Sequence, residues 1–240
     1  MARVLCLTVN EALAKGAAAT GDLAAVKVLM QRSFSMSSAH EAALEAAKCG
    51  YLHIVRYLVD ELKVVAVGLQ GVLREAATYG QLDVVRYLCE RPAGLCPELN
   101  LDGTCALECA AKHGHVAVVR YLCELPTRHG VLLRLRDAFR FAVENGQLKV
   151  VKCLCELSSD REVNPAYFNN YPLRLAAVYG HLPIVQYLCE LPAVDPRVLL
   201  QLGFERAVKD IARAAMEDRC RWGVRWSPLR AAWAGAVAAV

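Results

Sequence analysis

The sequence lacks any long hydrophobic run. Its longest stretch without a charged residue is 15 residues, Leu175 to Cys189, and Gly180 and Pro183 interrupt it. A membrane-spanning helix needs about 20 consecutive apolar residues, so we expect none. The apolar patch near the N-terminus, Val4 to Leu7, is too short for a secretory signal. These absences favour an intracellular, cytoplasmic protein.

The sequence also carries little net charge. There are 28 Lys and Arg against 24 Asp and Glu, a net charge of +4. Seven basic and four acidic residues follow Phe204, which leaves +1 for residues 1–203. A nearly neutral body does not indicate a nucleic-acid groove, so we expect no nucleic-acid partner. Because 56% of residues are hydrophobic, a largely disordered chain is excluded.

An internal repeat of 29 to 34 residues dominates what is present. Every copy has an alanine four residues before a glycine, a valine five residues after it and a leucine eight residues after it. The glycines that define repeats one to six are Gly21, Gly50, Gly80, Gly114, Gly146 and Gly180.

Each copy has the spacing of two helices separated by its glycine. Apolar residues two, five, eight and nine positions after the glycine form one stripe on a helix. A shorter helix, 73–79 in repeat three, precedes the turn, and glycine supplies the positive φ that ends it. Pro183 falls in the first turn of a second helix, where its missing N–H costs little. Such pairs bury their apolar faces only by stacking, which predicts an all-α solenoid.

The repeats resemble the ankyrin family. The segment 171–182, YPLRLAAVYGHL, and the segment 110–119, AAKHGHVAVV, are similar to its T-P-L-H-x-A-A-x-x-G-H-x-x-V-V pattern. The resemblance covers about residues 10–200 and implies stacked helix pairs connected by loops called fingers. Prolines replace the glycine that usually follows the second helix, so we expect irregular fingers. Gly103 alone matches the family's hairpin glycine.

The 11 cysteines and six histidines do not form a convincing metal or catalytic constellation. Cys89, Cys123, Cys155 and Cys189 share one repeat position, and equivalent helices lie about 8–10 Å apart. That separation is too large for a disulfide or a shared zinc ion. His115 and His181 follow turn glycines, where the family pattern uses histidine for local hydrogen bonding. We therefore predict a non-enzymatic protein with no catalytic residue, cofactor or metal.

Charged residues recur on the second helices. Arg56, Arg86, Arg120 and Lys152 stand six positions after the glycine, and an acidic residue follows each by four. We interpret them as a solvated outer face with ion pairs along each helix.

The two residues before each turn glycine vary most between repeats. The resemblance implies that they line a concave groove and, with the finger tips, contact a protein partner. The candidate contact residues are Thr78, Tyr79, Lys112, His113, Glu144, Asn145, Val178 and Tyr179, with Lys48 and Cys49 in the same column. Finger candidates are Asp102, Arg134, Arg136, Asn169 and Asn170. We expect a monomer that binds another protein by shape complementarity.

The C-terminal part differs from the repeats. We divide the chain into a repeat solenoid at 1–203, a capping helix at 204–220 and an Arg-, Trp- and Ala-rich tail at 221–240. The tail leaves one alternative open, a membrane-peripheral adaptor. A cysteine-based redox or catalytic protein is the second alternative.

Overall fold

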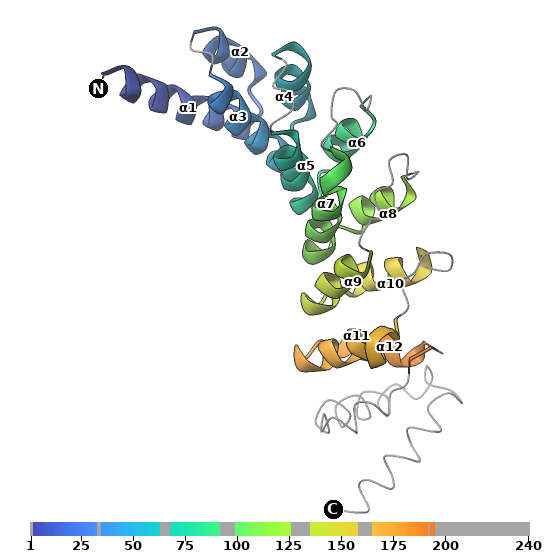
Figure 1. Ribbon diagram of the computed structural model, residues 1–240. Coiled ribbons are helices and arrows are strands. Elements are labelled where there is room, and N and C mark those ends of the chain that lie inside the picture. Colours follow the sequence, from blue (N-terminus) through green and yellow to red (C-terminus); the bar gives the residue numbers. More distant parts are fainter. Residues whose placement is uncertain are drawn as a thin grey trace, which may run out of the picture. The chain divides into compact units, whose positions relative to one another are not determined.

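A computed structural model of the chain describes residues 2–32, 35–62, 68–91, 99–125, 135–157, 165–191 and 193–194. Every regular element in these residues is a helix, and the helices follow one another as pairs (Figure 1). The predicted all-α fold is therefore confirmed. The chain divides into two compact units, Met1–Arg134 and Leu135–Val240.

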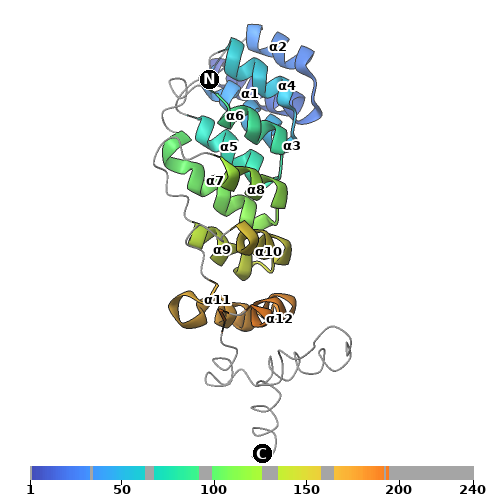
Figure 2. The same cartoon turned by 90° about the vertical axis from the view of Figure 1, so that its right-hand side faces the viewer.

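The first unit holds four helix pairs. First helices contact first helices of the next pair, and second helices do the same (Figures 1 and 2). The first helices are α1 (Ala2–Thr20), α3 (Met36–Cys49), α5 (Leu69–Thr78) and α7 (Leu99–His113). The second helices are α2 (Leu23–Arg32), α4 (Leu52–Arg56) continued by the π-helix η1 (Tyr57–Glu61), α6 (Leu82–Cys89) and α8 (Val116–Glu124).

The described part of the second unit repeats this arrangement with two pairs. Its first helices are α9 (Leu135–Glu144) and α11 (Tyr167–Val178), and its second helices are α10 (Leu148–Leu157) and α12 (Leu182–Glu190). Helix α11 packs on α9 and on its own partner α12, and α12 also contacts α10. Pro183 lies in the first turn of α12, as the sequence predicted.

Local signals explain where the helices begin and end. All six turn glycines have φ between 72° and 84°, which confirms the predicted left-handed turn. In repeats two to six, the N–H after the glycine donates to the carbonyl of the alanine four residues before it, at 2.8–2.9 Å. This bond satisfies a carbonyl that the helix end would leave unpaired. The side chains of Ser35 and Asp22 accept hydrogen bonds at the start of α3 and α2.

The core consists of the residues that recur in the sequence. In the described repeats, the two residues that stand four and three positions before each turn glycine of repeats two to six are buried, and so is the valine five residues after every turn glycine. The first of the two is always alanine, and the second is alanine except in repeat five, where it is Val143. Small alanines let adjacent first helices approach closely. The valines and leucines supply the apolar area, and each such side chain stabilises the fold by about 1.5–3 kcal/mol when it is fully buried.

The outer basic residues have a role that the sequence interpretation missed. Three of them, and Lys27 at the same position of repeat one, lie over a tyrosine ring in the following repeat. The pairs, with distances to the ring centroid, are Lys27–Tyr57 at 4.9 Å, Arg56–Tyr87 at 5.2 Å, Arg86–Tyr121 at 5.5 Å and Lys152–Tyr187 at 5.3 Å. These cation–π contacts tie neighbouring second helices together.

The acidic residue of the predicted pair in repeat two, Asp60, also makes contacts between repeats. Asp60 accepts a hydrogen bond from the Tyr87 hydroxyl at 2.8 Å and pairs with Arg91. Both partners belong to the next repeat, so the carboxylate joins two repeats rather than one helix turn.

Two further expectations are wrong. The first helix of repeat three begins at Leu69 and is longer than the predicted 73–79. Gly103, expected in a finger hairpin, lies inside α7. The segment around Gly103 is helical rather than a hairpin because α7 packs along α5. The capping helix at 204–220, the tail at 221–240 and most of the fingers lie outside the described residues.

Candidate functional site

The residue directly before each turn glycine is exposed in repeats two to six. Tyr79 is 46% exposed and Tyr179 is 55% exposed, both large values for tyrosine. Cys49, His113 and Asn145 occupy the same position in the other repeats and are exposed as well. One aromatic or polar side chain per repeat therefore faces solvent at the end of the first helix.

The residue two before the glycine behaves differently. Lys48, Thr78 and Glu144 are half-buried, whereas Lys112 is exposed and Val178 is 63% exposed. The Thr78 hydroxyl donates to the Arg74 carbonyl at 2.8 Å. Of the predicted contact residues, Thr78 and Glu144 therefore offer less free surface than their neighbours.

A side chain from the following repeat fixes each of these half-buried turns. Gln81 Nε2 donates to the Lys48 carbonyl at 3.0 Å. In the same way His115 Nε2 bonds the Thr78 carbonyl at 2.8 Å, and His181 Nε2 bonds the Glu144 carbonyl at 2.8 Å. Because a carbonyl only accepts, Nε2 carries the proton in both histidines. The expectation of local hydrogen bonding by these histidines is therefore wrong, since they join consecutive repeats.

The same side chains close over the turn glycines. A Cβ atom added to Gly80 would lie 2.4 Å from the His115 ring, and one added to Gly146 would lie 2.9 Å from the His181 ring. Nothing among the described residues lies within 4 Å of a Cβ added to Gly180. The described residues therefore leave the turn of repeat six open, whereas they cover the turns of repeats one, two, three and five.

Ring contacts hold the exposed aromatic residues in place. The Tyr179 and His181 rings are stacked with centroids 6.2 Å apart and planes 7° apart. Lys48 Nζ lies 5.4 Å from the centre of the Tyr79 ring. Rigid aromatic side chains lose little entropy on binding a partner.

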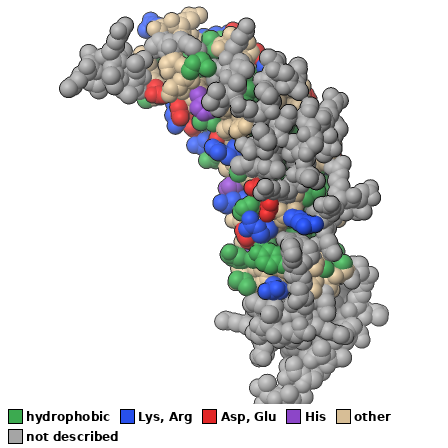
Figure 3. Space-filling view, viewed as in Figure 1, with side chains coloured by type: hydrophobic (Ala, Val, Ile, Leu, Met, Phe, Trp, Pro, Cys, Tyr) green, Lys and Arg blue, Asp and Glu red, His purple; other side chains and the backbone are tan. Residues whose placement is uncertain are grey.

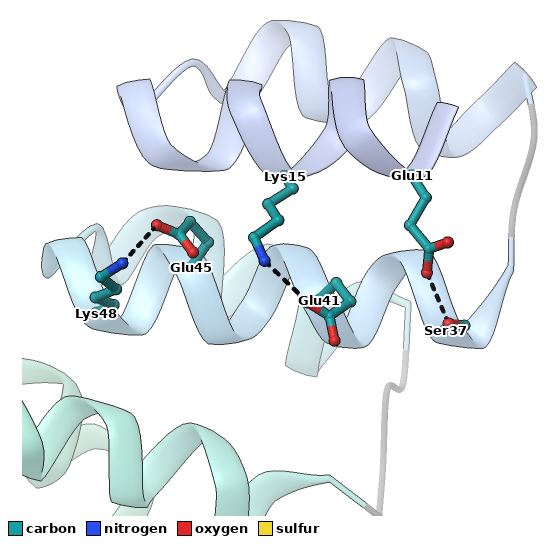
Figure 4. Close-up of polar contacts among 6 residues, drawn as sticks. All are labelled: Glu11, Lys15, Ser37, Glu41, Glu45 and Lys48. Atoms are coloured by element: carbon teal, nitrogen blue, oxygen red, sulfur yellow. Dashed lines mark hydrogen bonds and ion pairs between the residues drawn. The ribbon is translucent and has the colours of Figure 1, made fainter. Parts of the chain in front are cut away.

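Charged side chains lie along the first helices of repeats one and two, whose residues directly before the turn glycine are Thr20 and Cys49 rather than aromatic ones. Figure 4 shows that these charged side chains are paired with other side chains. Lys15 pairs with Glu41 at 3.3 Å, Glu11 accepts from the Ser37 hydroxyl at 2.7 Å, and Lys48 pairs with Glu45 at 3.3 Å. Because these groups are already satisfied, we expect less binding energy from them than from Tyr79.

The cysteines of the shared repeat position have the chemistry of core residues. Burial raises the pKa of Cys89 and Cys189 to about 12 and that of Cys155 to about 11. A thiol of that pKa is almost fully protonated at neutral pH and is a poor nucleophile. Among the described residues, no group of three or more His, Cys, Asp or Glu side chains is placed to hold a metal ion.

The finger candidates do not lie in fingers. Asp102 lies in α7, Arg136 in α9, and Asn169 and Asn170 in α11. Asn170 is buried and has φ 55°, two residues before Pro172. A buried asparagine inside a helix offers a partner little surface, so Asn170 is a weaker candidate than the exposed pre-turn residues. Arg134 lies outside the described residues.

Comparison with known families agrees with this architecture. A model of ankyrin repeats in three copies matches residues 13–95 and 66–137, and a model of a single ankyrin repeat matches residues 168–198. Together they cover more than half of the chain. The chain belongs to the ankyrin repeat family. Residues 138–167 fall outside both matches, yet α9, Gly146 and α10 form a helix pair there.

Ankyrin repeats are generally protein–protein interaction modules, and the family is typically non-enzymatic. A search of curated proteins found no match to this chain. No helix in the described part of the chain has the length and hydropathy that a membrane span requires.

Proposed function

We propose that this ankyrin repeat protein is a non-enzymatic scaffold or adaptor that binds a protein partner at the pre-turn residues. These are the two residues before each turn glycine in repeats two to six. The observation that supports the proposal most directly is the exposure of Tyr79, Val178 and Tyr179 beside turns that share one backbone conformation. Exposed aromatic residues on a preformed surface are typical of residues that dominate binding energy.

The chemistry of the described residues favours binding over catalysis. The cysteines with raised pKa values lack the thiolate that a redox or nucleophilic role requires. We further propose that the protein acts as a monomer without nucleic acid, because its repeat body is nearly neutral. A membrane-peripheral role of the tail has no support from the described residues.

Affinity capture from the native cell tests the proposal. The variant Tyr79→Ala with Tyr179→Ala should lose the captured partner, because both large exposed rings are removed without touching the core. A loss of at least tenfold in affinity is expected if each ring contributes about 1 kcal/mol or more.

Val28→Ala is the matched control, since Val28 is 47% exposed but lies on the second helix α2. Far-UV circular dichroism should be the same for all three proteins. If the double variant captures the partner as well as wild type, the pre-turn residues are not the binding surface.

A further inference from the structure

An arginine recurs six residues before the turn glycine in repeats three, five and six. These residues are Arg74, Arg140 and Arg174. Since the helix pairs share one backbone geometry, the three guanidinium groups start from equivalent positions on α5, α9 and α11. Their surroundings can therefore be compared residue by residue.

In the first two of these repeats a carboxylate of the same helix pairs with the arginine. Arg140 Nη1 lies 2.7 Å from Glu144 Oε1, and Arg140 Nε lies 3.9 Å from Asp137 Oδ1. Arg74 Nε lies 3.8 Å from Glu75 Oε1. Both arginines are thus already paired within the chain.

Repeat six has no carboxylate at any of these three positions. Tyr171 stands where repeat five has Asp137, and Val178 stands where it has Glu144. Leu175 stands where repeat three has Glu75. Arg174 makes no ion pair with any residue that the structure describes. Its charge remains while its partners have been replaced by apolar side chains.

The replacements also leave an apolar surface beside this arginine. Val178 is 63% exposed and Tyr179 is 55% exposed, the two highest values among the exposed large hydrophobic residues of the chain's described part. Val178 lies one helical turn after Arg174 and therefore on the same side of α11. Figure 3 shows hydrophobic side chains gathered on this part of unit 2, next to charged ones.

We infer that Arg174, Val178 and Tyr179 form a docking site for a partner segment that carries an Asp or Glu side chain next to a large apolar residue. The inference rests on the proposed function and adds the chemistry of the partner. The Arg174 guanidinium pairs with the partner's carboxylate, as the Arg140 guanidinium pairs with Glu144 in repeat five. The apolar neighbour of that carboxylate covers Val178 and packs on the Tyr179 ring. The Tyr179 ring is itself stacked with the His181 ring.

A displayed library of random 12-residue peptides, selected on the full-length chain, tests this site. Selected peptides should be enriched in an acidic residue beside a large apolar one. For a synthetic peptide of that kind, Arg174→Gln should weaken binding about tenfold or more, because a charge-assisted bond is lost. Replacing the peptide's own Glu by Gln should weaken binding equally, and this measurement does not depend on the folding of a variant. Arg174→Glu should shift the selection toward Lys and Arg.

Arg74→Gln is the matched control and should leave peptide binding unchanged. Selected peptides that lack acidic enrichment and bind Arg174→Gln as tightly as wild type would overturn this inference. The proposed function is tested separately, because loss of binding in Tyr179→Ala would still show that the pre-turn residues contact the peptide. Failure to select any peptide would overturn it too, because the site would not accept a linear acidic segment. A concentration-dependent dimer that Arg174→Gln dissociates would identify a second copy as the occupant and overturn it as well.

Discussion

The turns of repeats five and six share one backbone but have different surroundings. Gly146 and Gly180 both have φ 72°, and each follows a buried pair of residues, Ala142 and Val143 in repeat five and Ala176 and Ala177 in repeat six. The His181 ring covers Gly146 and bonds the Glu144 carbonyl, whereas the described residues leave Gly180 open and Val178 exposed. The same local structure is therefore closed in one repeat and accessible in the next.

This comparison separates two demands on a repeat position. The positive φ comes from the chain itself and is the same in every repeat. The close approach of another side chain comes from the neighbouring repeat, and none of the described residues approaches the turn of repeat six in this way. Only the second demand decides whether a turn is free to contact a partner.

Alanine substitution of the two glycines should give the largest difference. Gly180→Ala incurs the left-handed strain alone, about 1 kcal/mol. Gly146→Ala incurs that strain and also pushes a methyl group against the His181 ring, for a total of about 3 kcal/mol. Urea unfolding followed by circular dichroism measures both free energies. Equal losses would mean that the histidine ring moves away without cost.

Substitution of the covering histidine should have a smaller effect. His181→Ala leaves the Glu144 carbonyl without its side-chain donor and should destabilise the fold by about 1–2 kcal/mol. His181→Gln should recover most of this loss, because Gln81 of repeat three makes the equivalent bond to the Lys48 carbonyl of repeat two. The same unfolding experiment measures the change. A glutamine variant as unstable as the alanine variant would show that ring packing, not the hydrogen bond, holds the turn.

The smallest effect is expected at two arginines of unit 2, Arg140 and Arg174. Arg140→Gln removes partly exposed ion pairs with Glu144 and Asp137 and should cost about 0.5 kcal/mol at low salt, less at high salt. Arg174→Gln should not change stability, because the described residues give it no ion pair. Thermal unfolding at two salt concentrations measures both. A comparable loss for Arg174→Gln would show that this side chain supports the fold.

The fold could be predicted from the sequence because its signals are local and repeated. The glycine with positive φ, the alanine pair and the valine and leucine stripe each act within one helix pair. Six copies make the pattern readable even over residues 138–167, which the family models do not match. Gly103 misled the prediction, because packing along α5 holds its segment in α7.

The candidate site could be predicted only in part. The sequence indicated the column before each turn, and Tyr79, Val178 and Tyr179 are exposed there. It could not show that Asn170 is buried, or that Lys27 and Arg56 lie over tyrosines of the next repeat. Those contacts join residues about 30 positions apart, and their existence depends on how adjacent repeats pack.

By itself the sequence determined the helix pairs, their turns and their apolar stripe, because the turn glycine and the helical spacing of apolar residues are signals contained within each repeat of about 30 residues. Only the tertiary structure decided which polar groups are already satisfied. The half-buried Glu144 side chain pairs with Arg140, and the Glu144 carbonyl accepts a hydrogen bond from His181. Its counterpart in repeat six, Val178, is exposed. The physical reason is that a side chain's availability depends on the neighbouring repeat that packs against it.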